Sequence, residues 1–242
     1  MAEIVAYLED NPYYLSFLPV ALQYHMYKML TDTNDEGHYQ RYKLLLLENI
    51  NQLAGPELDS FYQVALNYST RKINAGKSSY LREYLEMYRH ALEREALFDD
   101  GELHPFLLKN TVTFALREGE FDWAEMYINQ YQDRLPAQHR ENAVNYNLAT
   151  LYFYKKDYDQ ALNYLRDVEY ENQTYNLNAK AMLLAIYYET DEIVALDSLF
   201  DAITAYLNRH KEIAEARRRS FRNLVSLTRK LTRIAPSDKA AL

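Results

Sequence analysis

The sequence predicts an all-α protein, namely a short α-solenoid of about five helical hairpins that ends in a long capping helix. One hairpin pattern occurs twice within residues 142–208, because Ala161 recurs as Ala195 and Leu165 recurs as Leu199, both 34 residues later. Repeats of this length are typical of stacked helical pairs, in which each pair covers the apolar face of the next. The composition agrees, because 48% of the 242 residues are apolar and only five are Gly and six are Pro, too few for an all-β fold.

The helical spacing of apolar residues, together with the Gly and Pro that interrupt it, defines the expected elements in order. One α-helical repeat domain should span residues 1–242. It should contain degenerate hairpins over 1–100, three clearer units over 105–209, a basic capping helix over 210–235 and a tail over 236–242. The expected helices cover residues 2–9, 19–30, 38–53, 56–74, 78–98, 105–118, 120–134, 139–155, 158–169, 173–189, 191–208 and 211–234.

The recurring alanines have a physical reason. Ala149 and Ala161 would lie where the two helices of a pair approach most closely. A larger side chain there would force the helix axes apart or strain its neighbours. Recurrence at the same phase of the repeat favours this packing role over simple helix propensity.

The three units over residues 105–209 resemble tetratricopeptide repeats. In the unit at 142–175, Asn145 stands where that family commonly has Trp, and Gln173 stands where it commonly has Pro. The residues that carry the resemblance are Leu148, Ala149, Tyr152, Tyr158, Ala161 and Leu165, with Phe121, Ala124, Ile128 and Pro136 in the preceding unit. The resemblance implies a right-handed superhelix of hairpins and a protein-binding function.

The resemblance also implies a concave groove, which one face of the first helix of each unit would line. The residues that fall on this face are Lys109, Arg117, Tyr146, Asn147, Tyr154, Lys180, Tyr187 and Tyr188. The chain has 24 Tyr, and a Tyr side chain combines a rigid apolar ring with a polar tip, which suits recognition. Because Tyr154 and Tyr188 recur in phase, packing between units is the competing interpretation of these two residues.

The groove residues predict a protein or peptide ligand, and Asn147 with the lysines would select a polar or acidic segment. Lys109 and Asn147 also match two positions of a clamp with which some members of the family hold the C-terminal carboxylate of a peptide. The remaining positions of that clamp differ, at Thr113, Leu177 and Ala181. A peptide of another kind is therefore favoured.

The charges are unevenly distributed along the chain. Residues 1–208 carry 17 Lys and Arg against 32 Asp and Glu, whereas residues 209–242 carry 10 against 3. The cations of the last helix are Arg217, Arg218, Arg219, Arg222, Arg229, Lys230 and Arg233. They lie mostly outside its apolar stripe, which predicts a cap with a solvated polar face.

The alternative function is a regulatory or oligomerisation domain of a larger protein, in which the basic C-terminal helix contacts an acidic partner. Nucleic acid is disfavoured as a partner, because the acidic remainder of the chain would repel phosphate groups.

Two short motifs imitate ligand sites but lack a required residue. The Gly-Lys-Ser at 76–78 matches the last residues of the phosphate-binding loop motif. That motif also needs a Gly five residues before Gly76, where this chain has Arg71, so we expect a helix break with a serine cap instead. The loop over residues 32–37 resembles the start of a calcium loop, but Lys43 stands at the twelfth position, where a bidentate Glu is needed.

No local pattern predicts catalysis, a metal or a cofactor. There is no Cys, and the six His lack the spacing of a helical zinc site. No apolar run is long enough to span a membrane, and Glu3, Glu9 and Asp10 interrupt any signal peptide. We therefore expect a non-catalytic, cytoplasmic scaffold that binds a protein or peptide, with its oligomeric state left open.

Overall fold

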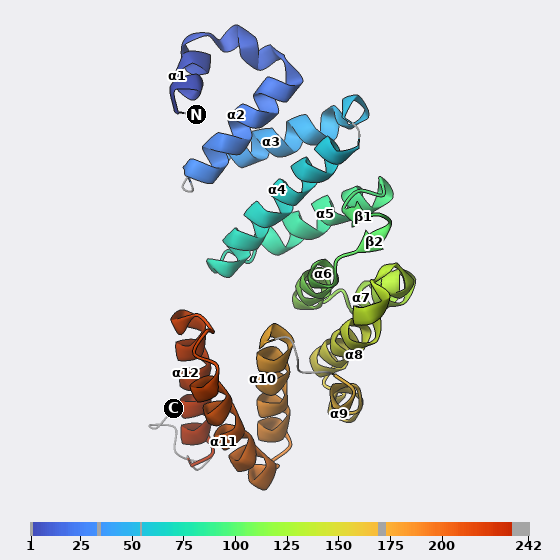
Figure 1. The fold of residues 1–242 in the computed structure, drawn as a ribbon, viewed down its shortest axis with the longest axis vertical. Helices are drawn as coiled ribbons and strands as arrows, with labels where there is room; N and C mark the ends of the chain where they lie inside the picture. Colours follow the sequence, from blue (N-terminus) through green and yellow to red (C-terminus); the bar gives the residue numbers. More distant parts are fainter. Residues whose placement is uncertain (1, 33–34, 54, 169–172, 234–242) are drawn as a thin grey trace. The chain divides into compact units, whose positions relative to one another are not determined.

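The computed structural model describes residues 2–32, 35–53, 55–168 and 173–233, which are almost entirely helical, as predicted (Figure 1). The helices are α1 (Ala2–Asp10), α2 (Leu18–Thr31), α3 (Gly37–Glu48), α4 (Pro56–Asn74), α5 (Tyr80–Glu93), α6 (Pro105–Arg117), α7 (Phe121–Tyr131), α8 (Ala137–Tyr154), α9 (Tyr158–Arg166), α10 (Gln173–Glu189), α11 (Ile193–Arg209) and α12 (Glu215–Leu231). Short 3₁₀ helices occupy Pro12–Ser16, Ile50–Gln52 and Gln132–Arg134. None of the described helices combines the length and the apolar character needed to cross a bilayer.

The chain divides into two compact units. Unit 1 comprises residues 1–104 and 117–119, and unit 2 comprises residues 105–116 and 120–242. In unit 1, α2 packs against α3 and α4 packs against α5. In unit 2, α8 packs against α9, α10 packs against α11, and α12 packs against α11. The hairpin pairing is therefore confirmed for these helices, whereas α6 and α7 of the unit predicted over 105–134 do not pack extensively on each other. The expected helix end at Ile234 and the expected tail over 236–242 lie outside the described residues.

The core of unit 1 is built largely from tyrosines. The fully buried ones are Tyr39, Tyr42, Tyr62, Tyr68, Tyr84 and Tyr88. The rings of Tyr39 and Tyr68 stack with centroids 4.5 Å apart, and the Tyr42 hydroxyl donates a hydrogen bond to the Phe61 carbonyl at 2.9 Å. Burial raises the pKa of Tyr39 and of Tyr42 well above the usual range of a phenol. Much of the high tyrosine content therefore serves packing in this unit.

The core of unit 2 contains the predicted packing alanines. Ala149 on α8 and Ala161 on α9 have no exposed surface, and Leu165 and Ile186 pack in the same cluster. Their burial confirms that these alanines are packing positions. On α7, the Trp123 ring stacks on the Tyr127 ring with centroids 5.0 Å apart.

Two stretches differ from the sequence-based expectation. The helix expected over 78–98 ends at Glu93, because Glu95 and Leu97 adopt positive φ angles of 52° and 74°, which a helix does not allow. The chain then forms a short antiparallel ladder between β1 (Phe98–Asp99) and β2 (Glu102–Leu103). The expected serine cap is also wrong, because Ser79 precedes α5 without a capping bond from its side chain.

Substitution of a buried and a half-buried alanine should show whether these alanines are needed for close helix packing or only for their helix propensity. Ala161→Leu adds volume at a fully buried crossing and should lower the free energy of unfolding by about 1–3 kcal/mol. Ala195→Leu adds the same volume at a half-buried position on α11 and should cost about 0.5 kcal/mol or less. Urea denaturation of both variants measures the difference, and equal losses would contradict the helix register described here.

Candidate functional site

Most of the predicted groove residues belong to unit 2, on α6, α8 and α10. Arg117 is the exception, because it is an exposed residue at the end of α6 that groups with unit 1. The partly buried members are Lys109, Tyr154, Lys180, Tyr187 and Tyr188. Tyr187 and Tyr188 pack against the apolar core formed by α10, α11 and α12, which agrees with the packing interpretation of Tyr188.

Tyr146 and Asn147 point into the core in this structure. The Tyr146 side chain is 4% exposed, and its ring lies 4.7 Å from that of Tyr175 in an edge-to-face contact. The Asn147 side chain has no exposed surface, and its Nδ2 donates to the Ala143 carbonyl at 2.7 Å. Neither side chain therefore offers accessible surface to a ligand, contrary to the expectation from the repeat pattern.

Two predicted lysines belong instead to a group of cations that we call the basic cluster, namely Lys109 on α6, Lys180 on α10 and Arg217 on α12. Arg217 acts electrostatically on Lys109 and on Tyr206, and the Tyr206 ring is the one that Lys180 contacts. Arg217 Nη2 donates to Asn178 Oδ1 at 3.3 Å, and Lys109 Nζ donates to Asn110 Oδ1 at 3.3 Å. Lys180 Nζ lies 5.6 Å from the centroid of a tyrosine ring on α11, at a distance typical of a cation–π contact.

The surroundings of the two lysines in the basic cluster destabilise their charged ammonium forms. Burial lowers the pKa of Lys109, and repulsion by Arg217 lowers it further. Burial also lowers the pKa of Lys180. Within the part of the chain that the structure describes, no carboxylate forms an ion pair with Lys109. A desolvated ammonium that lacks an opposite charge gains stability from a bound anion.

Arg217 is the site residue that the repeat pattern missed. The sequence placed it among the solvated cations of the last helix, but on α12 it precedes Phe221 by four residues. Phe221 packs against the core formed with α10 and α11, so Arg217 shares the packed face of α12. The spacing of four residues was the signal that could have identified it.

The motifs that imitate ligand sites have structural roles. Glu36 of the calcium-like loop forms ion pairs with Lys77 of the Gly-Lys-Ser tripeptide and with Lys72, and the Lys72 Nζ lies 3.0 Å from its carboxylate. These bonds, first of all that from Lys77, lower the pKa of Glu36 to about 2. Lys43 Nζ pairs with Glu83 at 2.6 Å. Among the described residues, no group of three or more His, Asp or Glu side chains has the arrangement of a metal site.

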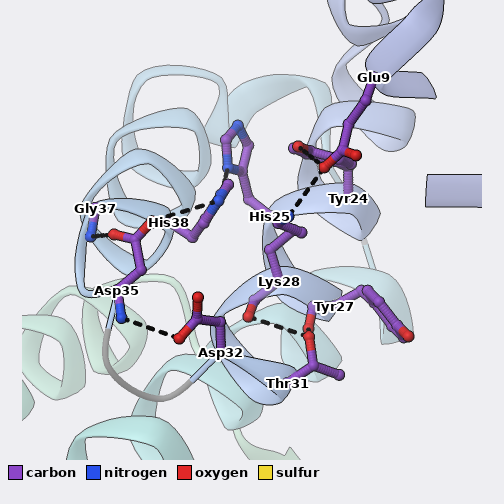
Figure 2. Close-up of polar contacts among 10 residues, drawn as sticks. All are labelled: Glu9, Tyr24, His25, Tyr27, Lys28, Thr31, Asp32, Asp35, Gly37 and His38. Carbon is purple, nitrogen blue, oxygen red and sulfur yellow. Dashed lines mark hydrogen bonds and ion pairs between the residues drawn. The ribbon is translucent and has the colours of Figure 1, made fainter. Parts of the chain in front are cut away.

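Unit 1 contains a second polar network, which joins α1, α2 and α3 (Figure 2). Lys28 Nζ and the Tyr24 hydroxyl both donate to Glu9 Oε1, at 2.9 Å and 3.2 Å. The Nδ1 atoms of His25 and His38 lie 2.9 Å apart, so one ring must donate and the other must accept. Two imidazolium rings could not keep this bond, because neither would have a lone pair.

Unit 1 also has an apolar hollow of about 480 Å³ between α1 and α2, lined by Ile4, Val5, Leu8, Val20, Met26 and Leu30 among others. Its lining supplies contact area but few polar groups that would orient a ligand. The basic cluster, with its desolvated charges, is therefore the better candidate for selective binding.

The histidine pair predicts a loss of stability in mild acid. Burial, repulsion by His38 and repulsion by Arg41 lower the pKa of His25 to about 4, against about 6.5 in an unfolded chain. The unfolded state therefore binds the proton more readily, so this contribution to stability is complete above about pH 6.5 and declines as the pH falls toward 4. Allowing for partial exposure, His25→Gln should remove about 1 kcal/mol of the loss between pH 7 and pH 5.

Urea unfolding at the two pH values measures this effect, and His139→Gln, which changes an exposed histidine, is the matched control. The same acid dependence in the His25→Gln variant as in the unsubstituted protein would contradict the role assigned to the pair.

The chain has no recognisable relative in the comparisons with known proteins. No family model, no curated protein and no solved structure matches it. The resemblance to tetratricopeptide repeats therefore rests on the residue pattern over 105–209 alone and stays a prediction.

Proposed function

We propose that the chain is a non-catalytic scaffold, a right-handed solenoid of tetratricopeptide-like hairpins, that holds an acidic peptide segment of a partner protein at the basic cluster. The observation that carries the proposal is Lys109, a partly buried ammonium that lies near a second cation and pairs with no carboxylate of the described residues.

The physical reason is the cost of such a charge. An ammonium loses favourable hydration when it is buried, and a like charge nearby adds repulsion. A carboxylate of a ligand would relieve both effects at once, and it would form charge-assisted hydrogen bonds with Lys109 and Arg217. The cluster is thus arranged for an anion supplied from outside the chain.

The surroundings of the cluster favour a peptide over a small anion. The cations come from three helices, α6, α10 and α12, and a peptide with several acidic side chains can contact more than one of them. Partly buried tyrosines on α8, α10 and α11, such as Tyr154 and Tyr206, supply ring surface for the side chains between the acidic residues. The net charge of −8 gives the chain no overall attraction for acidic molecules, so binding of such a peptide depends on a local group of cations.

Charge-removing variants test the proposal with a glutamate-rich peptide that carries a fluorescein label. Lys109→Gln and Arg217→Gln should each weaken its binding by about tenfold or more, which corresponds to ~1.4 kcal/mol. Fluorescence anisotropy measures the affinity, and a glutamine-rich peptide of the same length shows how much of it depends on charge. Arg219→Gln, which removes an exposed cation two residues along α12, is the matched control and should bind normally.

The free protein should respond in the opposite direction. Because Lys109→Gln removes a charge that burial and Arg217 both disfavour, it should raise the free energy of unfolding of the free chain. A decrease in stability, or equal losses of peptide affinity in the Arg217→Gln and Arg219→Gln variants, would show that the basic cluster is not the binding site.

A second candidate function is a regulatory or oligomerising domain that uses the outer face of α12. Leu227 is 59% exposed and Leu224 is 37% exposed, and they lie among the cations of the same helix. An amphipathic basic surface of this kind fits an acidic partner with apolar side chains. Leu227→Glu should abolish such an association, as measured by light scattering on mixtures with the partner, without changing peptide binding at the basic cluster.

A further inference from the structure

A hollow of about 290 Å³ lies between α11 and α12 in unit 2, and cations form half of its lining. It does not include the basic cluster. Its lining residues are Thr204 and Leu207 on α11, with Arg222, Val225, Ser226, Arg229, Lys230 and Arg233 on and just beyond α12. The size is at the lower end of small-molecule sites, which suits a compact polar group better than a long apolar one.

The cations reach the hollow because they recur along one face of α12. Arg222, Ser226 and Arg229 follow one another at intervals of three or four residues, the spacing that keeps side chains on one side of a helix. Arg233 comes four residues after Arg229, just beyond the end of the helix. Cations in the last turn also complement the negative end of the helix dipole. That structural role accounts for Arg229 and Lys230, but not for Arg222, which lies in the first half of the helix, or for Arg233, which follows its end.

The hollow keeps an excess of positive charge after its internal ion pairs are counted. Arg229 Nη2 pairs with Asp201 Oδ1 at 3.2 Å, and Arg222 Nη1 pairs with Glu215 Oε1 at 3.2 Å. Within the described ranges, no carboxylate pairs with Lys230 or Arg233. Four cations therefore face two carboxylates, and the remaining two positive charges match a phosphate group, which carries about −1.5 to −2 at neutral pH.

The donors are also partly fixed before any ligand arrives. The Arg229 guanidinium lies 4.9 Å from the centroid of the Phe200 ring, and its bond to Asp201 holds it from a second direction. A guanidinium held in this way presents its remaining N–H groups as a fork that matches phosphate oxygens. The Ser226 hydroxyl forms no hydrogen bond with another described residue, so it adds a donor inside the hollow.

We infer that the hollow between α11 and α12 is a binding site for a phosphate or phosphomonoester group, held by Arg222, Arg229, Lys230 and Arg233 with the Ser226 hydroxyl. The site is separate from the one proposed for an acidic peptide. A carboxylate has one negative charge and two acceptor atoms, whereas a phosphate group has more charge and three acceptor oxygens for a lining of four cations.

Calorimetric titration of the full chain with inorganic phosphate and with free phosphoserine tests the site, with sodium chloride at matched ionic strength as the blank. We expect saturable binding at one site. The affinities for inorganic phosphate and for phosphoserine then show whether the hollow prefers the free ion or a phosphomonoester. The Lys230→Gln/Arg233→Gln double variant should lose about tenfold or more in affinity. Arg219→Gln removes an exposed α12 cation outside the lining and should bind as before.

Two further variants show whether a loss of phosphate binding comes from the hollow itself, rather than from unfolding or from the peptide site. Ser226→Ala leaves every charge in place and should weaken phosphate binding by a smaller factor, while Lys109→Gln should leave it unchanged. Circular dichroism checks that α12 is retained in each variant. A double variant that loses helix stability but keeps its phosphate affinity would overturn the inference, because the cations would then serve only the helix dipole. Tighter binding to duplex DNA or to anionic vesicles than to phosphoserine would also overturn it.

Discussion

Ala149 on α8 and Ala161 on α9 have no exposed surface, and the close approach of helices at such small side chains is the constraint on which unit 2 depends. The flanking Leu165 and Ile186 fill the space on either side, and α10 covers this pair of helices in turn. Since each pair needs a neighbour to cover it, the last pair needs one too, and α12 does this with Val225, assisted by Ile213 in the turn before the helix. The requirement for a covering helix is thus what brings Arg217 into the site.

A cation on the packed face of a helix lowers the stability of the fold, because its charge loses hydration there. Arg217 shares the buried side of α12, donates to Asn178 and repels Lys109, whose own burial already disfavours its charge. A chain selected for stability alone would place an apolar or neutral residue at either position. Retaining Lys109 is understandable where an anion from outside the chain binds it.

The sequence predicted the helices well where periodicity and breakers agree, as at α4, whose bounds at Pro56 and Asn74 match the expectation. It did not predict the ladder at 98–103, because Glu95 and Leu97 adopt positive φ angles without a glycine to signal them. Repeat phase placed Lys109 and Lys180 on the predicted groove but did not place Arg217 near them, since the docking of α12 is a long-range contact. It also placed Tyr146 on the groove, although the ring is 4% exposed, because the residue pattern does not determine which neighbours cover a face.

Trp123 has a practical consequence for how the folding of this chain can be observed. It is the only tryptophan in the sequence, and it lies on α7 in unit 2, stacked on Tyr127. Indole emission therefore reports the opening of unit 2 alone, whereas the phenol absorbance of the buried rings is dominated by unit 1. Two optical signals from one sample thus follow different halves of the chain. Non-coincident transitions would reveal independent melting of the two units, and coincident ones a cooperative whole.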